Sequence, residues 1–184
     1  DLDVDVAAWS AITFSATLPL SLNGHTLIKT GNGSVQLHNV EGGGNVQVQS
    51  GELIIGGTHF GGGQYMVGSA GTLSGDGLLL AGVVNSGTVA PGASVGGLTV
   101  LGSYSQEVTG LLEMEIGGTT AVVGHDVLSV GGALIAAGTL KVLLADGHQP
   151  ELGNEYGLLS FGTATGTFTT LDLPTLATGL MWNS

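Results

Sequence analysis

The chain has 184 residues, of which 35 are glycine and none is cysteine. Fourteen acidic residues and only two basic ones, Lys29 and Lys141, give a formal net charge of −12, which argues against nucleic-acid binding and against docking on anionic lipid. The lack of a strict Gly-X-Y period excludes collagen, the abundance of apolar residues excludes a disordered chain, and no apolar run is long enough to span a bilayer.

Residues 1–22 alternate between apolar and polar positions. Apolar side chains occupy the even positions from Leu2 onward, with only Ser10 as an interruption. A period of two is typical of a strand with one buried face, but this segment is several times longer than a usual strand. Pro19 has no amide to donate and indicates an edge or a bend. We expect either the first turns of a larger β structure or a donor strand that completes a neighbouring subunit, with these contact residues: Leu2, Val4, Val6, Ile12 and Phe14.

A short unit recurs through residues 23–184. It consists of a glycine, a polar or small residue, an apolar residue, another polar or small residue and a second apolar one, as in residues 33–37, 44–48 and 138–142. Each unit predicts a strand with alternate side chains inside, and the glycines predict tight corners. One such strand cannot bury its face alone, so the units are expected to stack into a β-solenoid (β-helix) of roughly nine turns and about 40 Å.

The spacing of these units widens in the second half of the chain. The interval is 28 residues from Gly110 to Gly138 and again from Gly138 to Gly166. An alternative for this half is a glycine-rich β-sandwich, which would make a distinct C-terminal part that begins near residue 98.

Several stretches resemble repeats of bacterial surface proteins. The stretches LIKTGNGSVQLHN and GGGNVQVQSGELIIGG, within residues 27–57, resemble the passenger-associated repeat of autotransporter β-helices. Residues 71–106, with a Gly-Asp-Gly turn and a Pro-Gly-x-Ser corner before an apolar strand, resemble the segment that often follows it. GLLEMEIGG, HDVLSVGGALIAAGTLKVLL and LPTLATGLMWNS are similar to the ends of such regions in autotransporters and in PEP-CTERM-type exported proteins. The resemblance implies an exported, right-handed and mostly non-catalytic β-helical protein.

The stretch Gly92-Ala93-Ser94-Val95-Gly96 matches the Gly-x-Ser-x-Gly motif of a hydrolase nucleophile elbow. Such an elbow lies between a strand and a helix, and its serine needs histidine and acidic partners. Here Pro91-Gly92 is a turn and residues 98–101 are strand-like. We therefore expect Ser94 to lie at a corner and to do no chemistry.

Glu113 and Glu115 lie two residues apart on an expected strand and therefore on one face. Glycosidases need paired carboxylates about 5–9 Å apart. However, the alternation with Leu112, Met114 and Ile116 favours apolar side chains inside and solvated acids outside.

Four aspartates are candidate calcium ligands, because calcium prefers carboxylate and carbonyl oxygens. Asp1, Asp3 and Asp5 share one face, and Asp76 lies in a Gly-Asp-Gly turn. The tandem repeats of calcium-binding toxins are missing, so the favoured interpretation is solvated charges that discourage random edge pairing. No other cofactor is expected, because the five histidines lack metal-ligand spacing.

Taken together, these patterns predict a non-catalytic structural protein outside the cell or on the bacterial cell surface. We expect it to associate with itself into a homopolymer or fibre, or to act as an adhesin or matrix component. The competing class is a protein that binds or degrades polysaccharide. Its candidate aromatic contacts are Trp9, Tyr65, Tyr104 and Trp182, for which core or cap packing is the simpler explanation.

Overall fold

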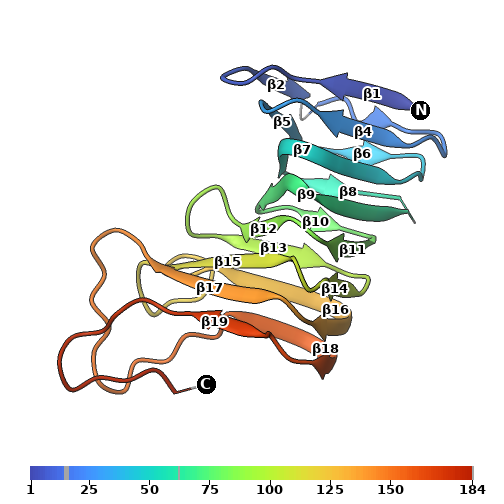
Figure 1. Ribbon diagram of the computed structural model, residues 1–184. Coiled ribbons are helices and arrows are strands. Elements are labelled where there is room, and N and C mark those ends of the chain that lie inside the picture. The colour runs from blue at the N-terminus through green and yellow to red at the C-terminus, as the bar shows by residue number, and fades with distance from the viewer. Residues whose placement is uncertain (15–16, 62, 184) are drawn as a thin grey trace.

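The computed structural model of the chain describes residues 1–14, 17–61 and 63–183, and all the regular elements in these ranges are β-strands. The strands stack one above another from the N-terminal to the C-terminal end of an elongated body (Figure 1). Within the described ranges, no helix exists that is long and apolar enough to cross a membrane.

The strands form three columns, which we name A, B and C. In each turn the chain contributes a strand to column A, then to B, then to C, and each strand pairs in parallel with the strand one turn later. Four long strands bend at a corner and contribute to two columns. Parallel strands cannot be joined by a hairpin, so a coil that returns to each column after a full turn satisfies this pairing.

Column A contains β1 (Leu2–Asp5), β4 (Leu27–Thr30), the first part of β7 (Val46–Ile55) and of β9 (Gln64–Gly75), β11 (Gly82–Asn85), β14 (Tyr104–Gln106), and the second part of β16 (Val127–Ala136) and of β18 (Leu159–Gly166). Column B contains β2 (Ala11–Phe14), β5 (Ser34–Leu37), the second part of β7 and of β9, β12 (Thr88–Pro91), β15 (Leu111–Ile116), β17 (Thr139–Leu144) and β19 (Thr170–Asp172). Column C contains β3 (Leu20–Ser21), β6 (Val40–Glu41), β8 (Thr58–His59), β10 (Leu78–Leu79), β13 (Gly97–Val100), and the first part of β16 and of β18.

The core consists of inward side chains that stack in register along each column. In column B, for example, Leu53, Leu73 and Leu112 are fully buried and belong to one row of paired residues. The burial of the strands alternates with a period of two, as in the pattern of β15. Inward apolar side chains therefore form one continuous core along the coil, which is the main source of its stability.

Glycines lie at the corner between columns A and B because successive turns approach closely there. A Cβ on Gly51 would overlap the carbonyl oxygens of Gly31 and Gly33, and Gly51 also has a positive φ of 68°. Gly87 has no positive φ, but a Cβ there would overlap the carbonyl oxygens of Gly68 and Gly71. The recurrent glycine therefore serves both purposes, a tight bend and room for the neighbouring turn.

Polar side chains at inward positions stabilise the same corner from inside. Lys29 is buried, and its Nζ donates to the carbonyl oxygens of Thr30, Gly31 and Ser50 over 2.7, 2.8 and 3.0 Å. Several turns later, Asn85 accepts a hydrogen bond from the Gly87 amide and donates to Leu111. These contacts provide partners for corner carbonyls and amides that face the dry interior.

The prediction of an all-β chain of stacked parallel units is confirmed. Leu27 pairs with Val46, which lies 19 residues later in the chain, whereas Tyr104 pairs with Leu134, which lies 30 residues later. The coil therefore has about eight turns rather than nine. After residue 98 the pairing stays parallel, as between β15 and β17, so the alternative of a sandwich of antiparallel sheets was wrong.

The longer turns extend the corner between columns B and C. This corner is short after β7, but it grows to residues 117–126 after β15 and to residues 145–158 after β17. These loops lie at the left of the lower half of the body in Figure 1. The additional residues of the longer repeats thus lie in loops at the corner between columns B and C.

Candidate functional site

Residues 1–22, which contain the predicted assembly contacts, pair with the next turn of the same coil. β1 pairs with β4 and β2 pairs with β5, so residues 1–22 are the first turn of the coil in this structure, apart from residues 15–16, which lie outside the described part. Val6 is buried, whereas Leu2 and Ile12 are each 40% exposed. Val4 and Phe14 are partly buried against the core. The residues predicted as assembly contacts are therefore inward side chains of the first turn that this sequence covers.

The last turn of the coil contains β18 and β19. β18 pairs with β16 and β19 pairs with β17, and their other edges face the end of the body. Phe161 is 46% and Leu171 48% exposed, although each continues a row of buried residues. These two side chains therefore belong to the last turn of the coil that this sequence covers.

A cavity of about 170 Å³ lies on the outer surface of column B, beneath the corner at residues 91–96. The cavity brings together three residues that the sequence singled out separately, Ser94, Glu113 and Glu115. Asp126, which follows the loop after β15, also lines it. Ser94 lies in a bend with no helix after it, so the nucleophile elbow is absent.

Asp126 is buried and joins two turns of the coil. Its Oδ1 accepts a hydrogen bond from the Gly96 amide and its Oδ2 accepts one from the Glu115 amide, both over 2.7 Å. Burial raises the pKa of this carboxyl to about 6, and the two amide donors offset part of that effect. The cavity thus holds a carboxyl with a raised pKa near two further acidic residues, Glu113 and Glu115.

Glu113 lies on the outward face of β15, as the alternation predicted, and there it forms an ion pair. Its Oε2 lies 2.9 Å from Nζ of Lys141, the residue that pairs with it on β17, and both side chains are about one-third exposed. This ion pair raises the pKa of Lys141. The pair lies at the surface, where such contacts contribute little to stability.

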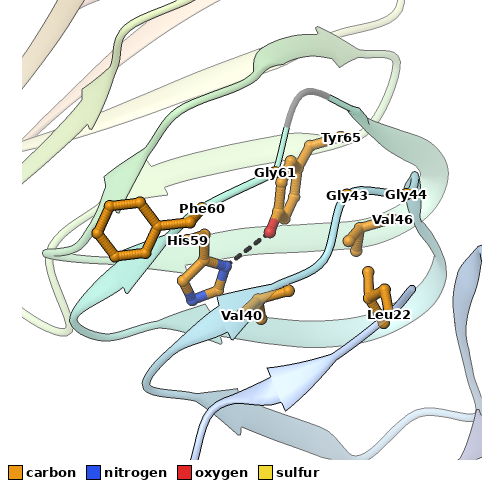
Figure 2. A pocket seen from close by; sticks show the side chains of 9 residues that line it. All are labelled: Leu22, Val40, Gly43, Gly44, Val46, His59, Phe60, Gly61 and Tyr65. Carbon is orange, nitrogen blue, oxygen red and sulfur yellow. Dashed lines mark hydrogen bonds between the residues drawn. The ribbon is translucent and has the colours of Figure 1, made fainter. Parts of the chain in front are cut away.

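A second, much smaller cavity of about 10 Å³ lies inside the coil (Figure 2). His59 and Tyr65 point toward one another at its wall, and Nδ1 of His59 lies 2.6 Å from the Tyr65 hydroxyl. This volume is close to the lower limit for one water molecule. The cavity is therefore a packing feature and no ligand site.

The aspartates predicted as calcium ligands do not form one group. Asp1, Asp3 and Asp5 belong to the first turn, where Oδ1 of Asp5 accepts a hydrogen bond from the Thr30 hydroxyl over 3.2 Å. Asp76 lies in the turn after β9, three turns away. Across the described residues, no three histidine, cysteine, aspartate or glutamate side chains are grouped so that they could hold a metal ion.

Two of the four aromatic candidates for sugar contact lie in the core. Tyr65 and Tyr104 are buried, whereas Trp9 is fully exposed at the first corner. Trp182 packs against the ring of Tyr156, with ring centres 6.2 Å apart, and donates to the Pro174 carbonyl over 2.8 Å. The loops at the corner between columns B and C therefore hold a small aromatic cluster.

Sequence reasoning did not find Asp126 as part of the cavity on column B. Nothing local in the sequence shows that its carboxyl folds back onto the amides of Gly96 and Glu115.

Comparison with known proteins adds no family assignment: no family model matches the chain, and no curated protein matches it.

Proposed function

We propose that this chain is a non-catalytic structural module of the bacterial cell exterior, a right-handed β-solenoid that associates with copies of itself through its N-terminal strands. The glycine-rich repeat and its resemblance to autotransporter passenger repeats support an exported protein. The net charge of −12 lies far from zero, which favours solubility. As an adhesin or matrix component it would present the long sides of the coil to its surroundings.

The observation behind this proposal is the parallel stacking of glycine-rich units in three columns around one continuous apolar core. The candidate assembly residues of residues 1–22 belong to strands that pair in register with the next turn of this core. Burying apolar surface gains about 25 cal/mol per Å², and a strand added to a neighbouring sheet contributes main-chain hydrogen bonds. Addition of these strands to a second copy would supply both contributions.

The test is the size of the protein in solution as a function of concentration. We expect sedimentation velocity and electron microscopy of the wild type to show elongated assemblies that grow with concentration. Ile12→Lys places a charge at the N-terminal edge and should leave monomers. The matched control is Val108→Lys, at a corner where the side chain is 80% exposed, and it should assemble like the wild type. A wild type that stays monomeric at every concentration contradicts the proposal.

The donor-strand version of the proposal makes a further distinction. If residues 1–16 leave their own coil and complete a neighbour, their deletion should give a folded monomer without filaments. Filaments formed by a well-folded deletion variant would eliminate this version. Circular dichroism of the variant establishes whether the remaining turns stay folded.

The cavity on column B supports a second candidate function, the binding or hydrolysis of polysaccharide. Its 170 Å³ are lined by Glu113, Glu115 and Asp126, and carboxylates are the groups that glycosidases use. A glycan array and a reducing-sugar assay on wild type and Glu113→Gln test it. Glu41→Gln, an exposed substitution outside the cavity, is the control. Activity that only Glu113→Gln abolishes would replace the structural function by this one.

A further inference from the structure

A short segment over the cavity on column B is held at each of its two ends. Residues 93–96, which we call the roof segment, follow β12, and the first two of their side chains are exposed. Before the segment, Gly92 and Gly75 exchange two main-chain hydrogen bonds over 2.8 Å. At its other end, the Gly96 amide donates to Asp126 over 2.7 Å. Glycine at both ends allows the segment to pivot, and Gly92 already has a positive φ of 88°.

The two anchors of the roof segment differ in their response to pH. The anchor at Gly92 consists of main-chain groups only. The anchor at Gly96 depends on the carboxyl of Asp126, which is 1% exposed and also accepts the Glu115 amide over 2.7 Å. Both donors are neutral amides, so they bind a negative charge on this carboxyl without cancelling it. Only the second anchor can therefore change when a proton is gained or lost.

The surroundings of Asp126 oppose its ionisation. The titratable groups around it are Glu52 on β7, Glu113 and Glu115 on β15, Lys141 on β17 and the adjacent His125. Lys141 is already paired with Glu113 over 2.9 Å, and Nδ1 of His125 lies 3.1 Å from the Gly118 carbonyl oxygen. Burial and neighbouring carboxylates both disfavour a charged carboxyl. In agreement, the pKa of Asp126 is raised to about 6, with burial as the largest cause.

We propose that ionisation of Asp126 releases the roof segment, so that the cavity on column B is covered in acid and accessible at neutral pH. With the segment in place the carboxyl is buried. Lifting the segment admits water to the carboxyl, which favours its charged form. This inference concerns access to the cavity, and it depends neither on self-association nor on what the cavity binds.

The direction of the effect follows from proton linkage. In the closed arrangement the pKa of Asp126 is about 6, whereas an open, solvated carboxyl has the ordinary value of 3.8. Between these values the closed arrangement holds a proton that the open one has released, so rising pH shifts the equilibrium toward the open arrangement. The shift is complete just above pH 6, and a difference of two pKa units corresponds to about 100-fold.

Amide hydrogen exchange measured by NMR tests this opening. At each pH the observed rate is divided by the rate of an unstructured peptide, which removes the pH dependence of the exchange chemistry itself. Protection of the Gly96 and Glu115 amides should fall by up to about 100-fold between about pH 4 and about pH 7. The Gly92 amide, which donates to the Gly75 carbonyl oxygen, is the internal control and should keep its protection.

Two variants assign the fall to the carboxyl. Asp126→Asn removes the titrating group, so the Gly96 amide should show the same protection at both pH values. Glu115→Gln keeps Asp126 but removes a neighbouring charge that raises its pKa, so the fall should become smaller and move to lower pH. The matched control is Glu41→Gln, an exposed substitution outside the cavity, which should keep the wild-type profile.

Every result of this experiment decides the inference. Protection of the Gly96 amide that is constant or rises with pH would overturn it, since the ionised carboxylate would then hold the roof segment at least as well. An equal fall at the Gly92 amide would show that the whole turn loosens, and this result also overturns it. If Asp126→Asn does not fold, Glu115→Gln decides: a profile identical to that of the wild type contradicts the inference, and a shifted one supports it.

Discussion

The hydroxyl of Tyr65 lies 2.6 Å from Nδ1 of His59 in the interior of the coil. Nε2 of the same imidazole lies 3.2 Å from the carbonyl oxygen of Leu37, so Nε2 holds the proton and Nδ1 accepts from the tyrosine. Both side chains are buried. The pair thus fixes a neutral histidine at an inward position between Val40 and Leu79.

We expect acid to destabilise the coil through His59. Burial lowers the pKa of His59 from its ordinary 6.5, so below that pH the unfolded chain binds a proton that the folded chain does not. The contribution of this group to the free energy of unfolding is therefore present above about pH 6.5 and lost as pH falls below it. Urea unfolding at a series of pH values measures the slope of the free energy of unfolding against pH.

Variants of His59 and Tyr65 can show whether this pair causes the pH dependence of stability. His59→Leu combined with Tyr65→Phe should flatten the profile in the window below pH 6.5, whereas His25→Gln, at an exposed position, should keep the wild-type slope. Tyr65→Phe alone leaves Nδ1 without a partner and should cost about 1–3 kcal/mol at neutral pH. A double variant with an undiminished slope would show that another group causes the acid sensitivity.

The two lysines of the chain should differ sharply in their contribution to stability. Lys29→Met removes the donor of three corner carbonyls, those of Thr30, Gly31 and Ser50. The carbonyls of Thr30 and Gly31 keep the Val6 amide and the Ser50 hydroxyl as donors, so the free energy of unfolding should fall by about 1–3 kcal/mol, the cost of one buried group that loses its partner. Lys141→Met breaks only a surface ion pair and should leave it unchanged within error. Equal stability of the two variants would contradict the role of Lys29.

Glycine at the corner between columns A and B should resist substitution for reasons of space. A Cβ on Gly87 would overlap the carbonyl oxygens of Gly68 and Gly71, and overpacking costs about 1–3 kcal/mol. Gly157→Ala is the control, because nothing lies within 4 Å of its Cβ position and its φ is not positive. Thermal unfolding should show a lower melting temperature for Gly87→Ala only. A stable Gly87→Ala would mean that the turns can move apart at low cost.

The alternation and the glycine repeat could be read from the sequence because they are local. In residues 33–37 the alternation predicts that the apolar side chains, Val35 and Leu37, point inward. Both are buried. The same reasoning identified the corners. These two features are sufficient for the stacked, all-β architecture.

The pairing register and the cavity could not be read in the same way. Tyr104 pairs with Leu134 across 30 residues while Leu27 pairs with Val46 across 19, and the difference depends on how much chain each corner loop absorbs. Asp126 lies at the end of such a loop, and its partners are 30 and 11 residues away. Contacts of this kind depend on tertiary stacking, which no local period encodes.

Asp126 should titrate near pH 6 in the folded protein. Burial raises the pKa of its carboxyl to about 6 from 3.8, so between these values the folded chain retains a proton that the unfolded chain has released. Its contribution to the free energy of unfolding is therefore complete below pH 3.8 and is lost as pH rises through about 6, opposite in sign to the effect of His59.

Carboxyl chemical shifts measured by NMR separate the two groups. We expect one aspartate with a midpoint near 6, absent in Asp126→Asn and retained in Asp76→Asn, which changes an exposed aspartate. The first variant should also lose about 1–3 kcal/mol at low pH, because an amide cannot accept from both the Gly96 and the Glu115 amides. At higher pH the difference in stability between Asp126→Asn and the wild type should shrink, because the buried ionised carboxylate destabilises the folded wild type. A midpoint at the ordinary value of 3.8 would show that the two amide donors fully offset the effect of burial, and that this carboxyl has already released its proton at pH 6.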